Sequence, residues 1–171
     1  MEKLKAGFLP ISMKLLNDSK PEIRVKLENF ADTISDELSR AGLEVIKAPI
    51  SCILEEFEKP IRIFKQESVD AIITLHLTYS PSLESAVLLS ETKIPLIILN
   101  TTPSISLGPN EVPDDITYNH GIHGVQDFCN ILGRQNKKFF IESGHWEKSD
   151  VIKRVLKRVI QASISKSYTG F

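Results

Sequence analysis

The chain has 171 residues, of which 42 % are hydrophobic and 25 % are charged, and its formal net charge is −1. This composition indicates one globular domain over residues 1–171 and excludes a disordered chain. The near-neutral charge gives no electrostatic reason to bind nucleic acid. No segment approaches the roughly 18 consecutive apolar residues of a membrane span, so no membrane partner is expected.

The first apolar run, residues 5–11, predicts a β-strand, and residues 21–42 predict a helix. Pro21 suits the first turn of that helix, and Gly42 suits the position just past its end. The apolar residues of the segment recur at steps of three and four, which is helix spacing; they are Ile23, Leu27, Phe30, Ile34 and Leu38.

A second strand is predicted at 43–49 and a third, rich in β-branched residues, at 69–77. Residues 53–68 between them have helix periodicity. Pro60 inside that segment predicts either a kink or a late helix start. A further helix is expected over 80–93.

Ser80 is the expected N-cap of that helix, with Pro81 in its first turn. Residues 94–100 form another continuous apolar run and predict the fourth strand. A polar, proline-rich loop is expected over 101–115. Three elements complete the chain, namely a helix over 123–136, a strand over 137–143 and a helix over 148–165.

The five predicted strands are continuous apolar runs that alternate with five helices, which is typical of a parallel sheet covered on both faces. Right-handed crossovers then predict an α/β fold. We expect a three-layer, doubly wound, Rossmann-like domain with a parallel five-stranded sheet in the flavodoxin-like order 2-1-3-4-5. Ligands of such sheets lie at the carboxyl ends of the strands.

The common ligand motifs of this fold are absent. A dinucleotide site needs G-x-G-x-x-G after the first strand, where the chain reads GFLPISMKLLND. Met13 to Leu16 do not form a flavin phosphate loop, and the chain has neither a P-loop nor a G-x-S-x-G elbow. A phospho-accepting receiver domain would need an aspartate at the end of the third strand, where this chain has His76 or Leu77.

The cysteines, Cys52 and Cys129, lie far apart and predict no disulfide framework. This favours a reducing, cytoplasmic location, with both thiols as small core residues. Adjacent acids such as Asp114 and Asp115 diverge on a helix and predict no catalytic pair. Glu142, at the end of the fifth strand, is the acid that remains a candidate.

The stretch from Tyr118 to Phe128 reads YNHGIHGVQDF and places His120 and His123 three residues apart, each followed directly by glycine. A metal site, an acid–base pair, a ligand-contacting loop and an ordinary loop would all use such residues. Neither cysteine has ligand spacing to these histidines, so no metal is expected in this domain. The residues alone therefore indicate a polar, histidine-bearing edge without a complete catalytic set.

Several segments together resemble the L-arabinose isomerase and L-fucose isomerase-like family. Thr78-Tyr79-Ser80-Pro81 is similar to the family's Thr-Phe-Ser-Pro segment, and IPLIILNTT is similar to its Pro-Leu-Leu-x-x-x-Thr strand. The likeness covers most of the chain. It is carried most specifically by Asn119, His123, Gly124, Phe128, Gly133 and Arg134, followed by a strand and Gly144-His145-Trp146.

The family converts aldoses into ketoses with a divalent metal, usually Mn²⁺, by moving a proton between C1 and C2. The resemblance implies that this chain is the N-terminal domain of a longer, homo-oligomeric isomerase-like protein and is not catalytic by itself. It also implies that the metal and the catalytic carboxylates lie in later domains. The implied contacts to a sugar shared with a neighbouring subunit are His123, His120, Met13 and Tyr79.

Two other interpretations remain open from the sequence. The chain is also consistent with a stand-alone sugar-binding or sensor module of flavodoxin-like fold, or with a domain whose edge serves only oligomerisation. The identity of the sugar stays open as well, because His120 stands where the family has glutamine. Trp146 is expected to cap the sheet edge, with His145 beside it.

Overall fold

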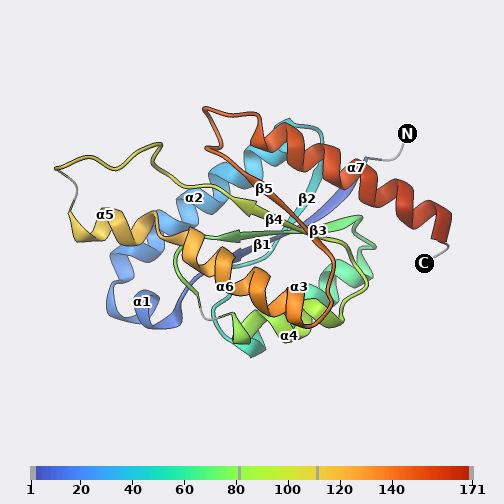
Figure 1. Ribbon diagram of the computed structural model, residues 1–171, viewed down its shortest axis with the longest axis horizontal. Helices are drawn as coiled ribbons and strands as arrows, with labels where there is room; N and C mark the ends of the chain where they lie inside the picture. Colours follow the sequence, from blue (N-terminus) through green and yellow to red (C-terminus); the bar gives the residue numbers. More distant parts are fainter. Residues whose placement is uncertain (1–2, 81, 111, 170–171) are drawn as a thin grey trace.

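The computed structural model describes residues 3–80, 82–110 and 112–169 and contains one five-stranded parallel sheet (Figure 1). The strand order is β2-β1-β3-β4-β5, which confirms the predicted flavodoxin-like α/β topology. The strands are β1 (Lys5–Ile11), β2 (Glu44–Lys47), β3 (Ala71–His76), β4 (Leu96–Asn100) and β5 (Phe139–Ser143).

Helices cover both faces of the sheet, and together with it they form three layers (Figure 1). The helices are α1 (Lys14–Ser19), α2 (Pro21–Arg40), α3 (Leu54–Gln66), α4 (Leu83–Glu91), α5 (Pro113–Tyr118), α6 (Gly121–Arg134) and α7 (Val151–Thr169). None of the helices in the described ranges is both long and apolar enough to cross a membrane.

The sheet separates two apolar cores. On one face, α2 and α7 pack against Phe8, Ile73 and Leu99. On the other face, α3, α4 and α6 pack against alternate residues of the same strands, such as Leu9 and Ile98. Successive strand residues point to opposite faces, so continuous apolar runs are what a sheet covered on both sides requires.

The long helix α2 follows its sequence signals closely. Pro21 occupies its first turn, and Gly42 lies just past its end with φ 111°, a left-handed conformation that glycine adopts without strain. The five apolar positions that predicted this helix are all buried. The amphipathic pattern therefore identified both the helix and its packed face.

The structure differs from three local expectations. The helix α3 begins at Leu54 and continues through Pro60, which excludes the late start, one of the two alternatives that Pro60 left open. The helix α4 begins at Leu83 with Ser82 as its N-cap residue, so Ser80 is not the cap; Pro81 lies outside the described residues. The edge strand β5 is not fully covered, because Phe140 and Ile141 are 37 % and 45 % exposed.

The short helices α1 and α5 were not predicted, because six residues are too few to show a period. The helix α5 lies at the end of the segment expected to be a loop, where Pro113 starts it and Asp115 accepts a hydrogen bond from the Val112 amide at 3.1 Å. It packs on α2 through Tyr118, whose hydroxyl donates to the Lys26 carbonyl at 3.0 Å. Both short helices lie at the carboxyl edge of the sheet (Figure 1).

Candidate functional site

The four residues predicted to contact a ligand lie in segments that follow the carboxyl ends of β1, β3 and β4. Met13 follows β1 and is half-buried against the core, while its amide donates to Thr78 Oγ1 at 3.4 Å. Tyr79 is the next residue along the chain after Thr78 and is 37 % exposed. The end of β3 is thus the point around which these segments meet.

The first turn of α6 packs directly on the end of β3, and this contact depends on two glycines. A Cβ atom at Gly121 would lie 2.0 Å from the His76 carbonyl oxygen. A Cβ atom at Gly124 would lie 2.8 Å from the His76 ring and 3.3 Å from the amide and hydroxyl of Ser80. Only glycine permits this approach, which explains why a glycine follows each histidine of the pair.

The same packing brings His120 and His123 together at the rim. His120 precedes the first helical residue and is half-buried, and His123 lies in the first turn and is exposed. Their ring centroids are 4.1 Å apart. The two imidazoles can therefore address one small polar ligand, each ring offering a hydrogen-bond donor or acceptor according to its tautomer.

His76 lies beneath this pair and has a different environment. Its ring is 2 % exposed, contacts Phe128 with ring centroids 5.2 Å apart, and has no hydrogen-bond partner for either nitrogen within the described residues. Burial lowers the pKa of the imidazole to about 4, so the ring is neutral at physiological pH. The His76 ring packs against the first turn of α6 and is too buried to contact a ligand beside His120 and His123.

Buried polar atoms without partners concentrate at this junction. Of the six such side-chain atoms in the described part of the chain, five belong to Thr74, His76, Ser80 and Ser82. The sequence predicts His76 at the end of the third strand, but the strand pattern alone does not reveal that its side chain is buried. The available signal was its spacing from Ile72 and Thr74, which places all three side chains on the face that α6 covers.

The other residues of the resemblance organise the edge. The Asn119 side chain accepts from the Ser104 amide at 2.9 Å and donates to the Asp115 carbonyl at 2.8 Å, which ties the loop after β4 to α5. His145 Nδ1 accepts from the Glu147 amide at 3.2 Å, and its Nε2 lies 3.4 Å from the Pro103 carbonyl oxygen. These side chains hold loops in place.

Trp146 packs against the core on the α2 and α7 face, and its amide donates to Thr101 Oγ1 at 2.9 Å. Its indole stacks on the neighbouring His145 ring with centroids 5.8 Å apart. The tryptophan thus caps this part of the sheet edge, as its position in the sequence predicts.

Glu142 is a structural residue. It is 6 % exposed and accepts hydrogen bonds from Arg154 at 2.8 Å and Arg158 at 2.7 Å, both on α7. Burial raises the pKa of the carboxyl, but the hydrogen bonds from Arg158 and Arg154 outweigh burial and leave the pKa below its ordinary value. An acid held ionised by two arginines anchors α7 to β5 and is not poised to move protons.

The cysteines are not reactive thiols. Cys52 is buried, Cys129 is half-buried, and both are unbridged. Burial raises the pKa of each thiol to about 11, which disfavours the thiolate. Within the described ranges, no group of three or more histidine, cysteine, aspartate or glutamate side chains converges to hold a metal ion.

Exposed apolar side chains gather in the segments at the same edge as the histidines. Eight of the fourteen large apolar side chains exposed in the described chain belong to segments that follow strand ends. They are Leu15, Leu54, Tyr79, Leu83, Ile105, Leu107, Val112 and Ile116. The carboxyl side of the sheet thus exposes apolar side chains together with the histidine pair.

Comparison with known proteins gives distant likenesses to solved structures. No protein-family model matches the chain, and no curated protein matches it. The Escherichia coli transcriptional repressor ascG is similar over 84 % of this chain and 59 % of the repressor chain, with 14 % identity and a TM-score of 0.37. An azoreductase from Bacillus anthracis str. Sterne is similar over 92 % of this chain and 99 % of its own, with 10 % identity and a TM-score of 0.31.

Proposed function

We propose that the chain is the substrate-edge and subunit-interface domain of a metal-dependent aldose–ketose isomerase-like protein of the L-arabinose and L-fucose type. The observation that carries the proposal is the exposed His123, held beside His120 at the carboxyl edge of the sheet. The support of this pair by Gly121 and Gly124 fixes its position relative to the sheet. Such a rigid, paired donor–acceptor group suits adjacent hydroxyls of a sugar.

The described residues of this edge provide binding groups but no proton-transfer machinery. Aldose–ketose conversion needs a base near C2 and a cation that polarises the two oxygens. Among the described residues, the histidine pair has no carboxylates converging with it into a metal-ligating group. In the proposed arrangement, the divalent metal and the catalytic carboxylates belong to another part of the assembly, and His123 contributes a hydroxyl contact to them.

The apolar side chains at the edge support a partner surface around that contact. Leu83 and Leu15 are 71 % and 70 % exposed, and Ile116 on α5 is 52 % exposed. Removing such side chains from water favours association, by about 25 cal/mol for each Å² of apolar surface buried. A neighbouring subunit that covers these residues would enclose His123 in a site shared between two chains.

The proposal is tested by separating binding from chemistry. We expect the 171-residue chain alone to convert no aldopentose or 6-deoxyhexose, measured as ketose by chromatography. In the complete protein, His123→Ala should raise the KM for the sugar about tenfold, because one hydrogen bond is lost, with a smaller change in kcat. Asn130→Ala, at an exposed position further along α6, is the matched control and should leave both constants unchanged.

Three results would count against this function. Isomerase activity of the isolated chain would show that the catalytic groups lie within it. An unchanged KM in the His123→Ala protein would leave the edge with an oligomerisation role only. Saturable, calorimetrically measured sugar binding by the isolated chain, without any effect of His123→Ala on turnover in the complete protein, would favour the sensor module.

A further inference from the structure

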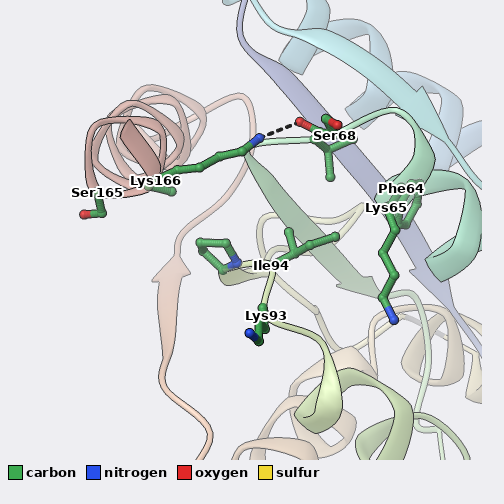
Figure 2. A pocket seen from close by; sticks show the side chains of 10 residues that line it. Phe64, Lys65, Ser68, Lys93, Ile94, Ser165 and Lys166 are labelled. Carbon is green, nitrogen blue, oxygen red and sulfur yellow. Dashed lines mark hydrogen bonds between the residues drawn. The ribbon is translucent and has the colours of Figure 1, made fainter. Parts of the chain in front are cut away.

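A cavity lies on the opposite side of the sheet from the histidine pair, beside the amino-terminal ends of β3 and β4, and has a volume of about 710 Å³ (Figure 2). This volume falls within the range of small-molecule pockets. Its walls come from the end of α3, the turn before β3, the segment before β4, and α7. The lining residues are Phe64, Lys65, Ser68, Val69, Lys93, Ile94, Pro95, Ala162, Ser165 and Lys166.

The floor of this cavity is apolar and belongs to the folded core. Phe64 is 1 % exposed, Val69 is 3 % exposed and Ala162 is 4 % exposed. Phe64 also packs on Gly7 of β1, where a Cβ atom would lie 2.6 Å from its ring. The floor is therefore held rigidly by the sheet.

The rim of the cavity is cationic. Lys65, Lys93 and Lys166 approach it from three different elements, and no carboxylate is among the described lining residues. Lys166 crosses from α7 to the turn before β3, where it donates to the Ser68 carbonyl at 2.8 Å (Figure 2). Asp70, 3.7 Å from the Lys166 ammonium, balances part of this charge from outside the lining.

A fourth ammonium group lies behind the same wall. Lys137 Nζ donates to the Ile94 carbonyl at 3.4 Å, and it also bonds the Thr92 carbonyl. The segment before β4 is thus held by a lysine on one side and faces the cavity on the other. The local positive charge stands out because the net charge of the whole chain is −1.

We infer that this cavity binds a small amphipathic carboxylate, with its hydrocarbon part on the Phe64, Val69 and Ala162 floor and its carboxylate at the lysine rim. An apolar floor favours a hydrocarbon group, and several ammonium groups around one rim favour an anion. A cavity of about 710 Å³ can hold a ligand of about ten heavy atoms or more. This site is separate from the histidine edge, so its test is independent of the proposed isomerase role.

The test compares octanoate and decanoate with the neutral alcohol 1-decanol, using calorimetry and methyl NMR shifts of Val69 and Ile94 in the intact chain. We expect saturable binding that strengthens up to about fourfold for each added methylene. Decanoate should bind more tightly than 1-decanol. Lys93→Gln and Lys166→Gln should each weaken decanoate about fivefold, without weakening the alcohol.

Two variants locate the site. Ser165→Trp places a large side chain at an exposed lining position and should abolish binding, while Lys157→Gln on the exposed side of α7 should leave binding unchanged. Circular dichroism checks that each variant is folded. Equal affinity for decanoate and 1-decanol, binding that survives Ser165→Trp in the folded protein, or no saturable binding at all would each overturn the inference.

Discussion

At the scale of single residues, the histidines of this chain have distinct roles that follow from burial. His123 is exposed and available to a ligand, whereas His76 is fully enclosed between β3 and α6. His145 is used to close a turn. The same kind of side chain thus serves as a packing group at His76 and as a turn cap at His145, and the proposed function uses it as a binding group at His123; the sequence distinguishes these environments poorly.

His76 should make the stability of the fold depend on pH. The unfolded chain takes up a proton at this residue below about pH 6.5, whereas the folded chain does so only near its lowered pKa of about 4. The contribution is fully present above about pH 6.5 and decreases as the pH falls toward 4. The free energy of unfolding should therefore drop by about 3 kcal/mol across this window, measured by urea denaturation.

The matched variant for this prediction is His76→Leu, which has similar volume and cannot titrate. Its free energy of unfolding should lack that part of the pH dependence, whereas His123→Ala should retain it. Parallel pH profiles for the wild-type chain and His76→Leu would mean that the buried imidazole does not resist protonation.

At the scale of elements, the contact between α6 and β3 decides the geometry of the candidate site. The helix approaches the strand end so closely that its first turn meets the His76 carbonyl, and Gly121 and Gly124 make this possible. Gly133, in the last turn of the same helix, has open space around it, with no neighbouring atom within 4 Å of the point that a Cβ atom would occupy. Two of the three glycines of α6 are therefore required by close packing, whereas Gly133 is not.

Replacing these glycines by alanine should give opposite signs. Gly121→Ala and Gly124→Ala force an extra methyl group against β3 and should each destabilise the fold by about 2 kcal/mol. Gly133→Ala adds a methyl group in open space and should stabilise the helix by about 0.5 kcal/mol. Urea unfolding measures all three, and NMR shifts of the His120 and His123 rings should move only in the first two.

A neutral effect of Gly121→Ala on both stability and the histidine shifts would contradict the proposed support of the pair.

The ionic contact between β5 and α7 acts at the same scale. Glu142 joins the edge strand to two arginines of the last helix, and Arg158 also lies 4.8 Å from the centre of the Phe140 ring. These contacts cover part of a strand on which Phe140, Ile141 and Ser143 are exposed.

At the scale of the whole molecule, one sheet forms a wall of both apolar cores. Each central strand places alternate side chains into the two cores. If the strands separate, the apolar side chains on both of their faces become exposed, so the two cores should unfold together. The two proposed sites lie at opposite ends of the strands, with the histidine pair at the carboxyl ends and the cavity at the amino-terminal ends of β3 and β4. A ligand at one edge does not require the other edge to be occupied.

This shared sheet predicts cooperative unfolding. Trp146, the chain's one tryptophan, packs on the α2 and α7 core, so its fluorescence reports that core. Circular dichroism reports the helices of both faces. We expect the two signals to change in a single, coincident urea transition. A fluorescence transition at a clearly lower urea concentration would show instead that the edge around Trp146 unfolds by itself.

The sequence by itself determined the fold class and the strand order. Continuous apolar runs required a sheet covered on both faces, and helix-spaced residues such as Ile23 and Leu38 required helices to cover it. Right-handed connections between parallel strands then restricted the order of the sheet. These signals are local, or depend only on the handedness of the chain, and therefore they are readable from the sequence.

Only the tertiary structure decided which polar side chains are exposed and which are buried or paired. The burial of His76, the pairing of Glu142 with Arg154 and Arg158, and the close contact of Gly121 with β3 each join residues far apart in the chain. The short helix α5 likewise depends on its packing against α2. Exposure and partners of a side chain are set by what packs over it, and periodicity along the chain does not contain that information.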